Sequence, residues 1–239
     1  ALQILKWCRS KMQTSSTKNK QQQQQEESSK SKQKTKQQQE ESANKFWRFQ
    51  LSWLCVYYVV MGADWLQGPV IYALYHSYGF NESQIAYLFI TGYFSSMLFG
   101  TIAGSLPDKF GRKWGCICFG LIYSFSCLTK LSLSFEVLII GRIAGGIGTS
   151  LLFSVFESWM VHEHKQRGFS QAQLQQTFSL ATFGNGVAAI LAGVVASHLV
   201  EHYGLVSSFM LSLSVIATLM NAINYDLINF FQIMQDESY

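Results

Sequence analysis

Six long apolar segments follow one another along the chain, separated by short polar connections. They lie at about residues 50–74, 84–106, 114–133, 135–160, 177–200 and 205–225. Each has the roughly 20 residues that an α-helix needs to cross the hydrocarbon core of a bilayer. Because backbone polar groups must be satisfied within the segment in that medium, helices are the expected form. The pattern predicts six consecutive antiparallel transmembrane helices.

The stretch before the first apolar segment has the opposite character. Residues 9–45 are rich in Gln, Lys and Ser and contain almost no apolar residues, so we expect a disordered cytoplasmic linker. Residues 1–8 are too short to span and are expected to be the stub of a preceding transmembrane helix. The six-helix bundle is then residues 46–228, and residues 229–239 are a cytoplasmic tail or the start of a linker. We expect the chain to be a piece of a longer protein.

Composition favours a membrane protein over a soluble one. Hydrophobic residues make up 49% of the 239 residues, aromatic residues 15% and charged residues 13%. The charged share is roughly half the usual share of about 25% in soluble domains. A soluble core of this length could not bury so much apolar surface, so we expect an all-α membrane protein with the lipid bilayer as a partner.

Basic residues are confined to alternate connections between the predicted helices. Lys109, Arg112 and Lys113 follow the second segment, and Lys165 and Arg167 follow the fourth. The outer connections after the first and fifth segments carry none, and the turn after the third has only Lys130 nearby, inside the helix end. Basic connections remain in the cytoplasm, which fixes the orientation of every helix. We therefore expect a multi-pass integral membrane protein, in the plasma membrane in preference to an internal membrane.

Two charged residues lie well inside the predicted helices. Asp64 is about 14 residues, or roughly 21 Å, from the cytoplasmic end of the first helix. Tyr57 and Gln67 share its helix face, and Gly68-Pro69 is expected to break or kink the helix just beyond them. Arg142 lies roughly 10 Å below the outer end of the fourth helix, so Asp64 and Arg142 are expected at similar depths.

Two interpretations of this pair stay open. An isolated charge in the bilayer costs about 3 kcal/mol or more, so a pair that faces a water-filled cavity is favoured. The pair could be a structural ion pair that locks the bundle. Alternatively, Arg142 binds an anionic substrate, for which a planar guanidinium is suited, or the pair responds to protonation of Asp64.

Further polar residues lie in or near the apolar segments. Asn185, between two glycines, is another candidate for substrate binding, although a hydrogen bond between helices would explain it equally well. Glu157 lies near the cytoplasmic end of the fourth helix. Lys130 and Glu136 are expected near the outer surface, in contact with water.

Small residues recur at every fourth position in three of the segments. They are Gly92, Ser96, Gly100 and Gly104 in the second, Gly141, Gly145 and Thr149 in the fourth, and Ala189, Gly193 and Ser197 in the fifth. Such faces let helix backbones approach closely in a membrane, so we expect them to be packing faces.

The sequence gives no indication of catalysis. The five cysteines have neither the spacing of a disulfide framework nor that of a metal site, and His162 and His164 diverge on a helix. No nucleophile–base arrangement and no phosphate-binding loop is present. We expect no catalytic residues, no cofactor, no metal and no nucleic-acid partner, and therefore no enzyme.

Two motifs carry a family resemblance. Residues 104–114, GSLPDKFGRKW, resemble the loop signature of the major facilitator superfamily, and residues 141–150, GRIAGGIGTS, resemble its helix-four signature. The resemblance implies the amino-terminal half of a facilitator and a charge network that gates it. The gating residues would be Gly104, Asp108, Gly111, Arg112, Lys113 and Glu157.

A narrower resemblance covers residues 46 to about 200. FWRFQL, ADWLQGPVIYALYHSYGF, CLTKLS and FSVFESWMVHEH are similar to the molybdate-anion transporter branch. That branch implies alternating-access transport of a small oxyanion such as molybdate, secondary active or facilitative. The resemblance also implies a further six-helix half or a second copy as a partner. A facilitator of a sugar, peptide or drug, and a half-length scaffold or sensor that does not transport, remain alternatives.

Overall fold

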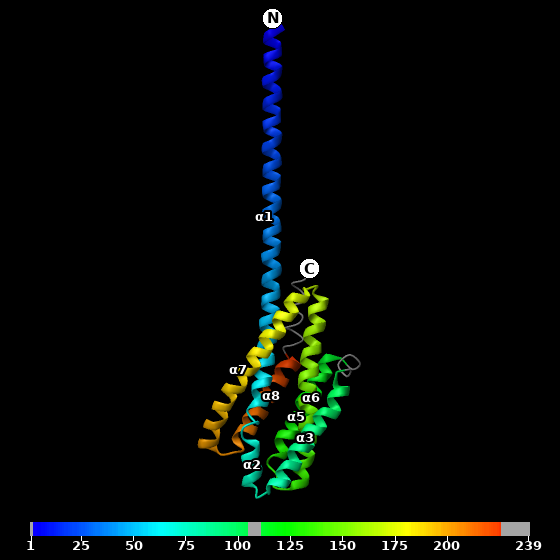
Figure 1. The fold of residues 1–239 in the computed structure, drawn as a ribbon, viewed down its shortest axis with the longest axis vertical. Coiled ribbons are helices and arrows are strands. Elements are labelled where there is room, and N and C mark those ends of the chain that lie inside the picture. Colours follow the sequence, from blue (N-terminus) through cyan, green and yellow to red (C-terminus); the bar gives the residue numbers. More distant parts are fainter. Residues whose placement is uncertain (1, 105–110, 226–239) are drawn as a thin grey trace. The chain divides into compact units, whose positions relative to one another are not determined.

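The computed structural model describes residues 2–104 and 111–225, without the side chains of residues 2–31, 112, 113 and 223–225. The described residues form helices and no strand. The helices are α1 (Leu2–Trp65), α2 (Ile71–Ser77), α3 (Glu82–Ala103), α5 (Arg112–Thr129), α6 (Phe135–Gln166), α7 (Gln171–Tyr203) and α8 (Ser207–Tyr225) (Figure 1). The chain divides into two compact units, Ala1–Leu51 and Ser52–Tyr239.

The first unit differs from the sequence expectation. Residues 9–45 lie within α1, where we expected a disordered linker, and residues 2–8 belong to the same helix. The segment 9–45 contains neither Gly nor Pro, and its Gln, Lys and Glu residues are good helix formers. A segment without apolar periodicity is not expected to pack into a hydrophobic core. It can still form an α-helix that its own backbone hydrogen bonds hold together.

The second unit is a bundle in which the apolar segments lie on helices. α3 and α5 pack against α6, α5 also packs against α8, and α7 packs against α8. Figure 1 shows α3, α5 and α6 running side by side. A buried cluster at one end joins the turn after α1 and α2 to α3, α6, α7 and α8, with Tyr75, Leu88, Leu138 and Phe209 at its centre.

The first apolar segment is interrupted where the sequence predicts a break. α1 ends at Trp65, and α2 begins at Ile71 after a turn that contains Gly68 and Pro69. Proline has no N–H, and its ring collides with the carbonyl of the residue four positions earlier, which here is Trp65. Gln67 therefore lies in the turn and not, as expected, on the same helix face as Tyr57 and Asp64.

Two of the three small-residue faces are packing faces. Gly146 adjoins the predicted row of α6, and a Cβ atom there would lie 2.8 Å from both the Ser95 side chain and the Ser96 backbone nitrogen of α3. A Cβ atom at Gly145, which belongs to the row, would lie 2.9 Å from Ser126 Oγ of α5. By contrast, a Cβ atom at Gly193 of α7 would meet no described atom within 4 Å. The glycines of α6 thus bring α3 and α5 close, whereas this part of α7 has no such contact among the described residues.

Gly146→Val is expected to destabilise the bundle, because an isopropyl group would have to fit between the α3 and α6 backbones. Overpacking of this kind costs about 1–3 kcal/mol. The free energy of unfolding of the detergent-solubilised chain measures the effect. Gly193→Val is the matched control, since it makes the same change where no neighbour is met; equal losses for the two variants would contradict the packing role of Gly146.

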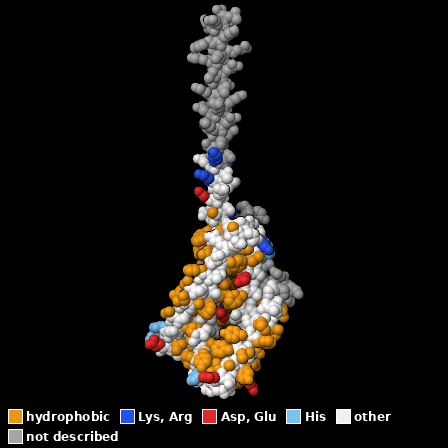
Figure 2. All heavy atoms as spheres, in the orientation of Figure 1, with side chains coloured by type: hydrophobic (Ala, Val, Ile, Leu, Met, Phe, Trp, Pro, Cys, Tyr) orange, Lys and Arg blue, Asp and Glu red, His pale blue; other side chains and the backbone are white. Residues whose placement is uncertain are grey.

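Apolar character is strong along several of the helices. α3, α6 and α7 are long and apolar enough to cross a membrane, and α5 and α8 contain the shorter apolar stretches Trp114–Thr129 and Ser207–Ala222. Hydrophobic side chains cover much of the face of the bundle drawn in Figure 2. Among those that remain exposed are Tyr93, Phe94, Met97, Phe183, Ile190 and Val194. Such a surface suits contact with lipid.

Candidate functional site

A cavity of about 300 Å³ lies between the end of α1, the turn after it, α3, α5 and α6. Its ionisable side chains include Asp64 of α1, Lys130 at the end of α5 and Arg142 of α6. Hydroxyl groups of Tyr123, Ser126 and Thr149 also line it. Four parts of the chain that are separate in sequence thus meet around one polar chamber.

Arg142 is held in this cavity by α3. Its Nε donates a hydrogen bond to the Leu88 carbonyl oxygen at 3.1 Å, and its guanidinium carbon lies 5.2 Å from the centre of the Phe89 ring. A Cβ atom at Gly92 would lie 2.7 Å from that same carbon, so only glycine leaves room for the guanidinium here. The packing of α3 on α6 therefore fixes the position of Arg142.

Lys130 lines the cavity and is a candidate for anion binding that the sequence analysis did not identify. The expectation that it is solvated near the outer surface is wrong, because the residue is only 1% exposed. α5 ends at Thr129, and the lysine side chain folds back along the last turn, where Nζ donates to the Ser126 carbonyl oxygen at 3.2 Å. Its backbone carbonyl accepts a hydrogen bond of 2.5 Å from the Tyr78 hydroxyl. The end of α5 thus turns a basic group into the cavity.

Asp64 lies on the last turn of α1 and is bound to α5. The Tyr123 hydroxyl donates a 2.5 Å hydrogen bond to Asp64 Oδ1. Among the described side chains no ion pair joins Asp64 to Arg142; the recorded pair is Arg167 with Glu163, at 3.6 Å near the end of α6. Asp64 and Arg142 therefore line the same cavity without a direct salt bridge. Tyr123, which sequence reasoning missed, is the residue that orients the acid.

The other three residues predicted to bind substrate have different surroundings. Gln67 lines the cavity, but its Nε2 already donates to Ser212 Oγ at 3.0 Å and Cys127 Sγ at 3.2 Å. Tyr57 is buried in a stack on Trp53, with ring centres 4.9 Å apart.

Asn185 is engaged with α1. Its Oδ1 accepts a 2.9 Å hydrogen bond from Trp65 Nε1, which is the interhelical bond that the sequence left as an alternative. Neither Asn185 nor Tyr57 is among the residues that line the cavity. The structure thus brings three of the five predicted residues, Asp64, Gln67 and Arg142, around one chamber.

The side chains of three of the six predicted gating residues are not described. Asp108 falls in the undescribed residues 105–110, and the side chains of Arg112 and Lys113 are likewise not described. Gly104 caps the end of α3, and Gly111 precedes α5 with φ +88°, a conformation that favours glycine. Glu157 is exposed on α6. The network itself remains a prediction.

The cavity has the chemistry of an anion site. Two basic side chains face it with one acid, and an arginine guanidinium together with a lysine ammonium can donate hydrogen bonds to the oxygen atoms of one anion. Its volume is at the lower end of the range for small-molecule pockets, about 300–1,000 Å³. A small polyatomic anion matches both the size and the charge.

Comparison with known proteins places the chain in a family. A family model of major facilitators, described as sugar transporters with 12 transmembrane helices, matches residues 28–230. The chain belongs to the major facilitator superfamily. The resemblance read from the two motifs is confirmed, as is the all-α membrane fold class. This facilitator chain is an integral membrane protein.

Three curated relatives of this facilitator chain are named molybdate-anion transporters. The Takifugu rubripes protein is 46% identical and the Danio rerio protein 43% identical over 175 residues, which is 72% of this chain and 36% of each relative. The Xenopus tropicalis protein is 44% identical over 161 residues, 67% of this chain and 36% of the relative. The chain therefore spans well under half of the length of the curated relatives it matches. No solved structure matches it.

Proposed function

We propose that this chain is the amino-terminal bundle of a facilitator that transports a small oxyanion, with molybdate as the substrate. The observation that carries the proposal is the cavity in which Lys130 and Arg142 both face a single acid, Asp64. The names of the curated relatives support the same substrate. Transport would be secondary active or facilitative.

Electrostatics favour an anionic substrate over a neutral one. Charged groups away from bulk water are costly unless a partner compensates them. In this cavity one acid faces two basic groups, so an anion would stabilise both basic groups in their charged forms. A sugar would leave that imbalance uncompensated.

Hydrogen-bonding geometry supports an oxyanion in particular. A guanidinium presents parallel N–H groups that match two oxygens of one anion, whereas an ammonium contributes a compact charge with three rotatable donors. The Thr149 side chain lines the same cavity, whereas the Ser126 hydroxyl already donates to the Gly141 carbonyl oxygen at 2.8 Å. Arg142 would set the orientation of the anion, and Lys130 would balance its charge.

Alternating access would move this bundle against a further six-helix half, or a second copy, around a site at the middle of the membrane. The gating network proposed for the loop after α3 consists of Asp108, Arg112 and Glu157, with Gly104, Gly111 and Lys113 shaping the loop. The plasma membrane is the proposed location.

Uptake by cells that express the full-length protein containing this chain tests the proposal. We expect saturable molybdate accumulation, measured by elemental mass spectrometry, that tungstate and sulfate reduce and glucose does not. Saturable uptake of glucose without molybdate uptake would favour the sugar transport named in the family description. Uptake of neither solute, at normal surface expression, would favour a scaffold or sensor.

A further inference from the structure

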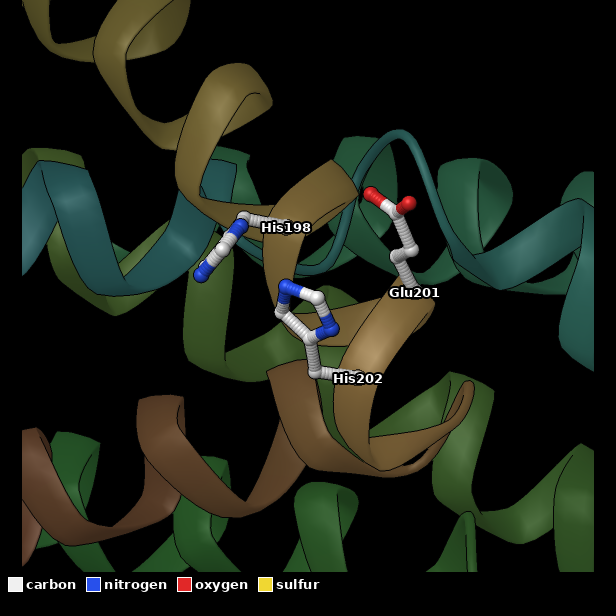
Figure 3. A group of neighbouring side chains, drawn as sticks. All are labelled: His198, Glu201 and His202. Carbon is white, nitrogen blue, oxygen red and sulfur yellow. The ribbon is translucent and has the colours of Figure 1, made fainter.

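The last turns of α7 carry a cluster of three potential metal ligands. His198, Glu201 and His202 are exposed, and their ligand atoms all lie within 4.8 Å of one another. Figure 3 shows the three side chains projecting from adjacent turns of the helix. The two imidazole rings have centres 4.3 Å apart and are nearly perpendicular, at 85°.

Helix periodicity brings these residues together. Positions i, i+3 and i+4 share one face of an α-helix, so His198, Glu201 and His202 form a single row although Leu199 and Val200 separate them in sequence. α7 ends at Tyr203, and Gly204 follows with φ +84°. The cluster is therefore part of the regular helix and does not depend on a loop conformation.

The ligand set selects a class of ion. Neutral imidazole suits zinc, copper and nickel, and two histidines one helical turn apart with a carboxylate are a recurring zinc-ligand arrangement. Calcium and magnesium prefer a shell of oxygen atoms, which this cluster does not provide. Two ligand atoms about 2.1 Å from a tetrahedral zinc ion lie about 3.4 Å apart, a distance that side-chain rotation at this exposed site can supply.

The other histidine-containing triplet shows what such a site requires. His162, Glu163 and His164 are consecutive, so the two histidines diverge on α6. His164 is buried with Nε2 2.8 Å from the Ser170 carbonyl oxygen, and Glu163 pairs with Arg167. His164 and Glu163 of this triplet thus already contact other residues of the protein, whereas His198, Glu201 and His202 on α7 are exposed.

We propose that His198, Glu201 and His202 form a surface site for a divalent transition-metal ion of the zinc and copper class. Three protein ligands leave further positions on the ion for water or for a group from another molecule. The ion would clamp the final turns of α7 just before the turn into α8. This inference is independent of the oxyanion cavity, and it revises the sequence expectation that the chain has no metal site.

Calorimetric titration of the chain with zinc chloride tests the site directly. The protein is purified in detergent through an affinity tag that contains no histidine. We expect one zinc ion per chain, with binding weakened about tenfold or more by either His198→Ala or His202→Ala, and to a smaller extent by Glu201→Gln. Copper added to the same samples should give nitrogen couplings from two imidazoles in electron paramagnetic resonance spectra.

The matched control is His162→Ala, which removes a histidine near the end of another helix and should leave zinc binding unchanged. Circular dichroism checks that the α7 variants keep their helix content, as expected for exposed side chains. Absence of zinc binding in the unaltered chain would overturn the proposal, and so would zinc binding by the His198→Ala and His202→Ala variants that is as tight as that of the unaltered chain.

Discussion

Arg142→Ala is expected to abolish saturable molybdate uptake by the full-length protein while leaving its amount at the membrane unchanged. Arg142 supplies the bidentate donor of the proposed anion site. Removing one partner of a desolvated charge contact costs about 2–5 kcal/mol, which corresponds to a loss of about 30-fold or more in uptake at low molybdate. The initial rate, measured by elemental mass spectrometry against molybdate concentration, gives the result.

Arg167→Ala is the matched control, because it removes the same side chain from a partly buried pair near the end of the same helix, outside the cavity. Arg142→Lys separates charge from geometry: it keeps the charge and loses the planar fork, so partial uptake is expected. Saturable uptake at the normal rate by Arg142→Ala would remove this residue from the substrate site.

Lys130→Met is expected to lower molybdate uptake at low molybdate concentration by about tenfold or more. Methionine keeps an unbranched chain of comparable length, so the packing at the end of α5 should survive while the basic group is lost. If Lys130 balances the charge of the substrate, the concentration for half-maximal uptake should rise by about tenfold or more. The same uptake measurement over a wide range of molybdate concentrations shows the shift.

The control for this variant is Lys165→Met, since Lys165 is exposed at the end of α6. Lys130→Arg should retain more uptake than Lys130→Met, because it preserves the charge. A normal half-maximal concentration in Lys130→Met would show that the buried lysine is a structural group of the α5 end and not part of the substrate site.

The helices of the bundle could be predicted because the positions of long hydrophobic segments determine where helices form in a membrane protein. The apolar segments lie largely on helices among the described residues, with limits shifted by a few residues, and the break in the first segment lies at Gly68-Pro69 as predicted. α1 extends through residues 9–45 because local helix propensity does not need an apolar face. The pattern of hydrophobic and polar residues does not reveal this local propensity, so the helix was not predicted.

The site was harder to predict than the fold. Asp64 and Arg142 stood out since charges in apolar segments are rare. Lys130 was missed because its burial depends on where α5 ends and on which way a side chain at that end folds. Asn185 and Tyr57 were equally plausible from sequence. In the structure, however, Asn185 accepts a hydrogen bond from Trp65, and Tyr57 stacks on Trp53. Only three-dimensional neighbours distinguish these cases.

The contact between Gly92 and the Arg142 guanidinium also has a consequence for how such chains can diverge. A mutation that gives position 92 a side chain would push the arginine out of its place against α3, so it could persist only alongside a change at position 142. The residues at positions 92 and 142 are expected to covary among related transporters. A relative with a larger residue at the position of Gly92 should therefore recognise its solute by other means.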